Sequence, residues 1–254
     1  IKLAITEDQY KKDNTTKILK LNKKCKAIIK AKESFHIYGL KWFSDVFKSV
    51  NKSTKIKLKV KDGDLVKKNK IIGEIYGTNH ALLNSERVAL NYLQTMSGTY
   101  DKCIRFRKKI SNKKIQLLHT RKTIPLYRLP LSEACNAAGC APHRYDLSSS
   151  ILIKENHLKL ASKPLDLITK AIKKDKIVVV EAKTLKFAKM VSNLKISRIL
   201  LDNFTPAMIK SFVSSNPKVK IEISGSINLS NINKFFNCIL FNYSCSLNKK
   251  HKSS

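Results

Sequence analysis

The second part of the chain repeats one pattern, in which a short apolar run ends in polar residues and a stretch with helical spacing follows. The apolar runs are residues 115–118, 151–153, 178–180, 199–201, 221–223 and 239–241, and the helical stretches include 165–172, 185–191 and 206–213. The polar residues that end the first five runs lie 21 to 33 residues apart, a spacing typical of β/α units around a parallel sheet. With one further unit expected near 129–141, the pattern predicts a parallel α/β barrel with fewer than eight strands.

The first part of the chain, residues 1 to about 83, mixes the periods of helix and strand. Residues 40–50 carry apolar side chains at helical spacing, whereas residues 56–60 alternate strictly, as a half-buried strand does. A turn signal at 62–64 precedes the apolar stretches 71–72 and 74–76, which can return as strands. These patterns predict a mixed α/β domain.

A long helix is predicted to join the two parts. It covers residues 84–110, with Asn84 or Ser85 as its N-cap. Apolar or aromatic residues recur every four positions and would form its core-facing stripe: Val88, Tyr92, Met96 and Tyr100. We therefore predict an N-terminal domain over residues 1–100 and a C-terminal domain over residues 101–254, whose last residues can return to the first domain.

Composition excludes several classes of protein. Apolar residues make up 43% of the 254 residues, which favours a folded core over disorder. There is no run of 18 apolar residues, so a transmembrane helix is excluded. The first eight residues contain two acids and no apolar segment, which does not resemble a secretory signal, and the six cysteines contain no CxxC pair. We therefore expect a cytoplasmic protein without a disulfide scaffold, a structural zinc site or a membrane segment.

The formal net charge of +33 is unusual and would attract nucleic acid, anionic membranes or anionic substrates. The lysines are spread over the whole chain, and asparagine and isoleucine, which A/T-rich codons also encode, are abundant. We therefore favour solvated lysines over a dedicated surface for nucleic acid. Only seven glycines are present, and neither a GxGxxG nor a Walker A pattern occurs.

The polar residues at the ends of the predicted strands carry the candidate chemistry. In parallel barrels the active site is formed at the C-terminal ends of the strands. Those ends bring together three cations and two acids: Arg121, Lys122, Lys154, Glu181 and Asp202. This combination suits an anionic substrate that develops positive charge at its reacting centre.

Several motifs in this chain resemble quinolinate phosphoribosyltransferase, also called nicotinate-nucleotide pyrophosphorylase (carboxylating). The most specific are Thr-Arg-Lys-Thr-Ile-Pro at 120–125, followed by His143-Arg144 and by Leu-Ile-Lys-Glu-Asn-His at 152–157. Supporting matches in the same order are Glu7-Asp8, Asp13 to Thr16, Glu86-Arg87, Leu90-Asn91, Ser97-Gly98, Leu201 to Asn203 and Glu222 to Gly225. The resemblance extends over nearly the whole chain.

The resemblance implies an N-terminal α/β sandwich domain that covers the barrel mouth of a partner, followed by an open α/β barrel with the active site. It implies a homodimer or larger assembly with shared active sites. It also implies that quinolinate and phosphoribosyl pyrophosphate, with Mg²⁺, give nicotinate mononucleotide, pyrophosphate and CO₂ in NAD biosynthesis.

The resemblance also implies roles for individual residues. The implied substrate-binding residues are Arg87, Thr120, Arg121, Lys122, His143, Arg144, Lys154, Glu181, Asp202, Ser224, Gly225 and Ser226. Lys122, Glu181 and Asp202 are the implied catalytic residues, and Glu181 and Asp202 are also the implied Mg²⁺ ligands. Quinolinate carries two adjacent carboxylates, which arginine and lysine side chains bind well.

The chain departs from the family pattern at some positions. Three successive glycines of the family are Ala138-Gly139-Cys140 here, and the family's last phosphate-binding turn corresponds to Phe241 to Ser246. Phenylalanine at a glycine position would block close approach of the backbone to a phosphate. Three alternatives therefore stay open: a weakly active or inactive homologue, a basic nucleic-acid-binding protein on the same fold, and a related enzyme that acts on nicotinate.

Overall fold

The structure is a computed structural model that describes residues 1–19, 22–110, 115–174, 177–236 and 243–246, the last of these by their backbone only. Contacts divide the chain into two units. Unit 1 consists of residues 1–104 and 129–138, and unit 2 consists of residues 105–128 and 139–254. Among the described helices, none is long and apolar enough to cross a membrane.

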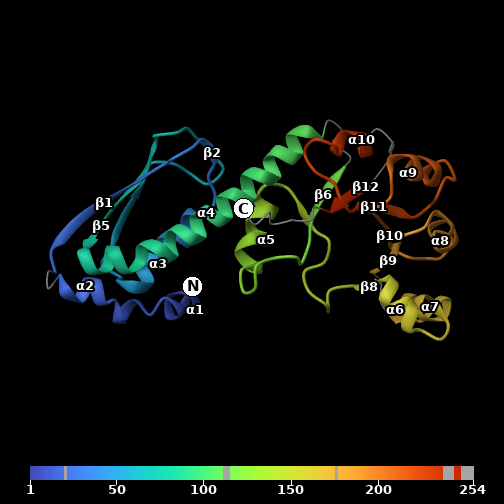
Figure 1. Cartoon of the computed structure of the whole chain (residues 1–254), viewed down its shortest axis with the longest axis horizontal. Coiled ribbons are helices and arrows are strands. Elements are labelled where there is room, and N and C mark those ends of the chain that lie inside the picture. Colours follow the sequence, from blue (N-terminus) through green and yellow to red (C-terminus); the bar gives the residue numbers. More distant parts are fainter. Residues whose placement is uncertain (20–21, 111–114, 175–176, 237–242, 247–254) are drawn as a thin grey trace. The chain divides into compact units, whose positions relative to one another are not determined.

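Unit 1 is built on a three-stranded antiparallel sheet with the order β1-β5-β3. Its strands are β1 (Lys24–Lys30), β3 (Lys55–Leu58) and β5 (Ile71–Thr78), and β2 (Phe35–His36) pairs separately with β4 (Leu65–Val66). Its helices are α1 (Lys2–Glu7), α2 (Asn14–Ile18), α3 (Leu40–Val50) and all but the last five residues of α4 (Asn79–Lys109), with a 3₁₀ turn at Tyr10–Lys12. Most of α5 (Arg128–Ala137) also belongs to this unit (Figure 1).

The helix predicted over 40–50 is confirmed as α3, and its apolar stripe is buried. The start predicted for the long helix was wrong, because α4 begins at Asn79 and neither Asn84 nor Ser85 caps it. The Thr78 hydroxyl accepts a hydrogen bond from the Ala81 backbone N–H at 3.3 Å and serves as the cap instead. The helix therefore follows β5 directly.

Unit 2 contains a seven-stranded parallel sheet with the order β7-β6-β12-β11-β10-β9-β8. Its strands are β6 (Gln116–His119), β7 (Ala141–Pro142), β8 (Ile151–Ile153), β9 (Val178–Ala182), β10 (Arg198–Asp202), β11 (Lys220–Ser224) and β12 (Tyr243–Ser246). Its helices are α6 (Glu155–Leu160), α7 (Pro164–Lys174), α8 (Leu185–Val191), α9 (Pro206–Val213) and α10 (Ile232–Phe236) (Figure 1). Strands β7 and β8 are the two edges, so the prediction of an open parallel α/β architecture with fewer than eight strands is confirmed.

Five of the six predicted apolar runs became strands close to their predicted bounds. The sixth run, 239–241, lies outside the described residues, and the described strand nearest to it is β12. The unit expected near 129–141 is present as α5 followed by the short strand β7. Helix α6 was not predicted: it starts just after β8, where the Lys154 backbone N–H donates to Nδ1 of His157 at 3.0 Å.

Side chains along the strands of unit 2 alternate between the two faces of the sheet, so the main core and the predicted site residues lie on opposite faces. Side chains on one face pack with the helices into the main core, for example Val178 and Val180 of β9 and Ile221 and Ile223 of β11. The opposite face carries a small apolar cluster of Leu152, Val179 and Leu200. Because strand side chains alternate with a period of two, Glu181, Asp202, Glu222 and Ser224 also belong to this second face.

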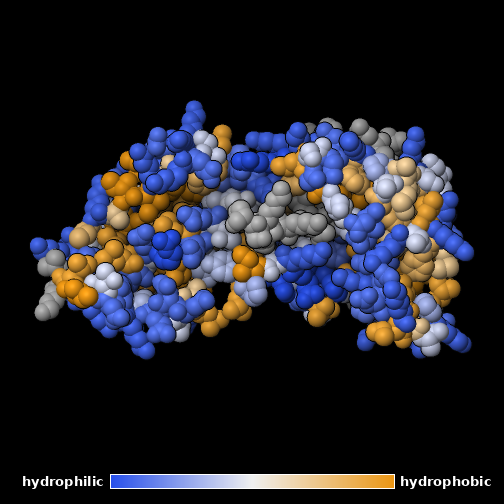
Figure 2. All heavy atoms as spheres, in the orientation of Figure 1, coloured by the Kyte–Doolittle hydropathy of each residue, from blue (hydrophilic) through white to orange (hydrophobic). Residues whose placement is uncertain are grey.

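Hydrophilic side chains are spread over both units on the face of the molecule that Figure 2 shows, with hydrophobic residues between them. This face therefore has no single hydrophilic block. The distribution agrees with lysines that are scattered along the whole sequence.

Candidate active site

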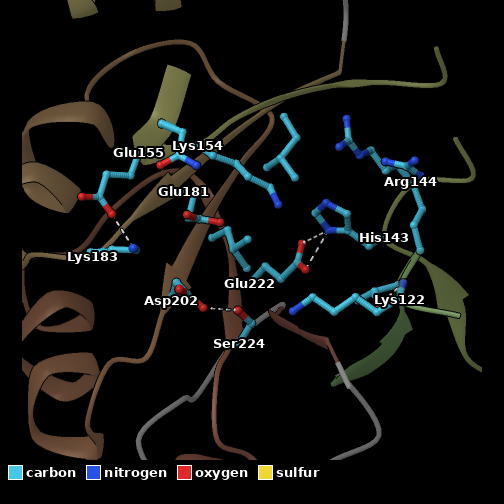
Figure 3. Close-up of a pocket in the computed structure, with 15 residues that line it drawn as sticks. Lys122, His143, Arg144, Lys154, Glu155, Glu181, Lys183, Asp202, Glu222 and Ser224 are labelled. Carbon is cyan, nitrogen blue, oxygen red and sulfur yellow. Dashed lines mark hydrogen bonds and ion pairs between the residues drawn. The ribbon is translucent and has the colours of Figure 1, made fainter. Parts of the chain in front are cut away.

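A cavity of about 500 Å³ lies at the C-terminal ends of the parallel strands of unit 2 (Figure 3). Nine of the residues predicted for substrate binding line it: Thr120, Arg121, Lys122, His143, Arg144, Lys154, Glu181, Asp202 and Ser224. Gly225 and Ser226 follow the last of these without lining the cavity. Arg87 belongs to unit 1, where it is exposed on α4.

Six residues that line the cavity were not among the predicted site residues, although four of them lie in the family motifs: Leu152, Glu155, Asn156, Lys183, Leu200 and Glu222. Strand alternation could have identified two of them. Leu200 lies two residues before Asp202, and Glu222 lies two residues before Ser224, so each shares a sheet face with a predicted site residue.

One side of the cavity is basic. Figure 3 shows Lys122, His143 and Arg144 together on this side, where they follow β6 and β7. Burial lowers the pKa of the Arg144 guanidinium, and the nearby charge of Arg121 lowers it further. Nε of Arg121 is also buried and has no hydrogen-bond partner among the described residues. A partly desolvated guanidinium beside a second cation favours an anion between or beside them.

The other side of the cavity carries two carboxylates. Figure 3 shows Glu181 of β9 and Asp202 of β10 across the cavity from Arg144. Burial raises the pKa of Glu181, and the charge of Asp202 raises it further, while Lys154 and Lys183 act in the opposite direction. A cation that binds or develops beside these carboxylates would relieve their mutual repulsion.

Hydrogen bonds hold the Asp202 carboxylate in place. The Ser224 hydroxyl donates to one oxygen at 2.8 Å, and the Asn203 amide donates to the other at 3.2 Å. The predicted role of Ser224 in substrate binding stays a prediction, and in this structure its hydroxyl is directed at Asp202. The Asn203 backbone N–H in turn donates to the Ser224 carbonyl at 2.9 Å, which ties the ends of β10 and β11 together.

Gly225 is required beside this arrangement. Its φ is +93°, and a Cβ atom there would lie 2.1 Å from Oδ1 of Asn203 and 2.7 Å from its backbone nitrogen. A side chain would therefore displace Asn203 as well as strain the backbone. The predicted role of Gly225 in substrate binding stays a prediction, whereas its structural role is evident from this contact.

We expect Gly225→Ala to lower the free energy of unfolding by about 1–3 kcal/mol and to reduce activity, because Asp202 loses the support of Asn203. Chemical denaturation and an activity assay measure the two effects. Gly98→Ala is the matched control, since a Cβ there meets nothing within 4 Å and the residue lies inside α4. This control should be neutral or more stable by up to about 1 kcal/mol. Equal behaviour of the two variants would contradict the assignment.

A cluster of one glutamate and two lysines lies beside the cavity. Lys159 contacts Glu155 at 2.6 Å, and Lys183 also forms a hydrogen bond with Glu155 (Figure 3). These two lysines lower the pKa of Glu155 to about 2, so it is ionised at neutral pH. Glu155 is thus engaged by two lysines, whereas Glu181 and Asp202 are carboxylates that can serve a ligand.

A fourth acidic group, Glu222, is completely buried beside the basic side. Nδ1 of His143 lies 2.8 Å from both carboxylate oxygens of Glu222 (Figure 3). Arg198 donates to the His143 carbonyl at 2.8 Å and lies 3.6 Å from the Glu222 carboxylate. His143 is therefore fixed from two directions.

Both parts of the chain match known protein families. Residues 13–97 match the N-terminal domain of quinolinate phosphoribosyl transferase, and residues 101–251 match its C-terminal domain. The chain belongs to the quinolinate phosphoribosyltransferase family. The resemblance that the sequence motifs indicated is thus confirmed.

Individual family members support this assignment. The chain is 30% identical to a probable nicotinate-nucleotide pyrophosphorylase (carboxylating) of Bacillus subtilis, over 90% of this chain and 81% of that protein. It is 31% identical to the chloroplastic enzyme of Arabidopsis thaliana, over 92% of this chain and 74% of that protein. Among solved structures, it resembles NadC from Streptococcus pyogenes (TM-score 0.87, 29% identity) and nicotinate-nucleotide pyrophosphorylase from Francisella tularensis (TM-score 0.85, 30% identity). Each structural match covers 96% of this chain and 88% of the other.

The departures from the family pattern at 138–140 lie away from the cavity lining. Ala138 and Cys140 are buried, and Gly139 is retained at φ +79°. A positive φ of this size favours glycine, whereas a Cβ there would meet only the flexible end of the exposed Arg107 side chain. Phe241 and the side chains of residues 243–246 lie outside the described residues, and the prediction about that phosphate turn stays a prediction.

Proposed function

We propose that this chain transfers the phosphoribosyl group of phosphoribosyl pyrophosphate to quinolinate, with release of pyrophosphate and CO₂ and formation of nicotinate mononucleotide. The observation that carries the proposal is the division of one cavity into a basic side and an acidic side. Its lining residues match the family motifs, and relatives at about 30% identity are named for this reaction.

The basic side suits quinolinate. Its two adjacent carboxylates need several donors in a confined space, and Arg121, Arg144 and Lys122 supply cationic ones. Leu152 and Leu200 also line the cavity and offer an apolar surface for the pyridine ring. We propose that these residues orient the ring so that its nitrogen faces the ribose C1 of the second substrate.

The acidic side suits the ribosyl group. Departure of pyrophosphate leaves positive charge on the ribose C1 and ring oxygen in the transition state. We propose that Glu181 and Asp202 stabilise this charge or bind the ribose hydroxyls. The hydrogen bonds from Ser224 and Asn203 fix Asp202 in advance, so little reorganisation is needed during the reaction.

The family implies Mg²⁺, and the acidic side fits it in part. Carboxylate oxygens are suitable donors, and Mg²⁺ commonly takes one or two of them together with substrate phosphates and water. The described residues contain no cluster of three or more acidic, histidine or cysteine side chains arranged for a metal ion. We therefore propose that Glu181 and Asp202 hold Mg²⁺ only together with the pyrophosphate group, whose negative charge the metal neutralises.

We further propose a homodimer, or a larger assembly, in which Arg87 of one chain completes the cavity of another. The support is the family motif that contains Arg87 and the exposure of this residue on α4. Arg87 is a cation of the kind that the quinolinate carboxylates require. A cytoplasmic location also stays a prediction from the sequence.

Replacing Arg144 by methionine should weaken quinolinate binding by about 30-fold or more, because the loss of one partner from a desolvated charge pair costs roughly 2–5 kcal/mol. Affinity for phosphoribosyl pyrophosphate should change much less. Isothermal titration with each substrate in turn measures both. Lys210→Met, which removes an exposed cation of α9 outside the cavity, is the control for net charge. Equal losses in the two variants would show a general electrostatic effect and refute this role of Arg144.

A further inference from the structure

His143 and Glu222 form a buried pair at the edge of the cavity. The side chain of Glu222 has no solvent exposure, and His143 is 9% exposed. Both oxygens of the carboxylate lie 2.8 Å from Nδ1 of the ring. An ionised carboxylate can only accept hydrogen bonds, so this geometry places a proton on Nδ1.

The other ring nitrogen of His143 has a different environment. Nε2 is buried and has no hydrogen-bond partner among the described residues, although His143 lines the cavity. An unsatisfied buried polar atom is costly, and such atoms in a folded protein call for an explanation. Because Glu222 occupies Nδ1, Nε2 is the ring nitrogen left for a ligand.

The position of Glu222 in the sheet is unusual for a charged residue. It lies in the middle of β11, between the buried Ile221 and Ile223, and its register partner on β10 is Leu200. An apolar residue would fit such a position without the cost of desolvating a carboxylate. The chain therefore retains a buried charge where packing alone does not need one.

Arg198 completes the cluster from the first residue of β10. Its Nη1 lies 3.6 Å from the Glu222 carboxylate, and its Nη2 donates to the His143 carbonyl. These contacts fix the backbone of His143 and balance the charge of Glu222. Arg198 does not line the cavity, so the contact with His143 links the cavity to charged groups behind it.

We infer that Glu222 is a positioning residue. It holds the His143 ring through Nδ1–H, so that when a substrate carboxylate binds, Nε2 takes up a second proton from solvent and donates it in a hydrogen bond to that carboxylate. Arg198 supports this pair. The inference rests on the proposed function, because it takes quinolinate to be that substrate. Glu222 itself does not need to touch the substrate. The same arrangement, in which a carboxylate orients a histidine through its second nitrogen, is common at metal sites.

The test is titration of Glu222→Gln with quinolinate and with phosphoribosyl pyrophosphate. Glutamine preserves size but offers one acceptor oxygen instead of two, and its amide group meets Arg198 unfavourably. We expect quinolinate affinity to fall by about tenfold or more, as for histidines at metal sites that lose their outer partner. Phosphoribosyl pyrophosphate affinity should stay nearly unchanged. Glu74→Gln, which removes an ion-paired carboxylate from unit 1, is the control.

A double variant, Glu222→Gln with Arg198→Gln, distinguishes the proposed positioning role of Glu222 from a role in stability alone. Removing both charges should restore much of the stability that the single change loses, but quinolinate binding should stay weak. Nitrogen-15 spectra of the imidazole of His143, recorded without ligand, give a second measurement. They should show the proton on Nδ1 in the unmodified protein and a changed distribution in Glu222→Gln.

Two results would overturn the inference. One is quinolinate binding by folded Glu222→Gln within twofold of the unmodified protein; the other is an unchanged nitrogen-15 pattern. If the unmodified protein does not bind quinolinate at all, the proposed function fails. The nitrogen-15 spectra then still decide whether Glu222 orients His143, so the two failures are distinguishable.

Discussion

Replacing Glu181 by glutamine should lower the turnover number by about 10²–10³-fold, because the variant keeps the shape of the side chain but loses its negative charge. That charge lies beside Asp202 on the acidic side of the cavity, where we propose that ribosyl positive charge develops. Quinolinate affinity should change little, since the ring carboxylates are assigned to the basic side. Steady-state kinetics together with quinolinate titration separate the two effects.

The control for Glu181→Gln is Glu133→Gln. Glu133 lies in unit 1, where it accepts a hydrogen bond from the Trp42 indole. The variant therefore measures how much turnover falls when a partly buried glutamate outside the cavity is neutralised. If Glu181→Gln retains normal turnover but loses quinolinate binding, Glu181 belongs to the carboxylate-binding side. The proposed division of the cavity would then be wrong.

Mixing two inactive variants should restore activity if the active site is shared between chains. Arg87→Ala and Lys154→Ala should each abolish activity as homodimers, because every site then lacks one of the two cations. In a hybrid dimer, one site carries both defects and the other carries neither. Random exchange makes half of the dimers hybrids, so activity should return to about a quarter of that of the unmodified protein.

The decisive control is mass spectrometry that confirms the formation of hybrid dimers. A mixture of Arg87→Ala with Glu181→Gln should regain activity in the same way, since Glu181 also lies in unit 2. Confirmed hybrids without recovered activity would mean that Arg87 serves the barrel of its own chain or does not serve the site. The proposal of a shared site would then be refuted.

Much of unit 2 could be predicted from its sequence because its buried strands are short, uninterrupted apolar runs. Helices α8 and α9 begin and end where the spacing of apolar residues indicates, and Pro206 marks the first turn of α9. The start of α4 was missed although its first residue, Asn79, is of a capping type, and the side-chain oxygen of Asn79 accepts a hydrogen bond from the Lys23 backbone N–H at 3.0 Å instead of capping the helix. Thr78, which caps it, belongs to the end of β5.

The site could be predicted where a residue ends a strand and carries charge, as Glu181 and Asp202 do. Glu222 belongs to a motif that the sequence analysis identified, but it was not assigned to the site because it lies within an apolar strand, two residues before the predicted Ser224. Glu222 and His143 are 79 residues apart in the sequence, and the spacing of residues along the chain does not predict a contact over that separation. Helix α6 was missed because the polar residues after β8 are typical of a loop. The hydrogen bond from the Lys154 backbone N–H to His157, which caps this helix, is not evident from the sequence.

The central claim is tested most directly by incubating the protein with quinolinate, phosphoribosyl pyrophosphate and Mg²⁺ and measuring all three products. The account predicts nicotinate mononucleotide, pyrophosphate and CO₂ in equal amounts, with no turnover when either substrate is omitted. Nicotinate in place of quinolinate should not react. Binding of both substrates without any product, or turnover with nicotinate and none with quinolinate, would contradict the proposed function.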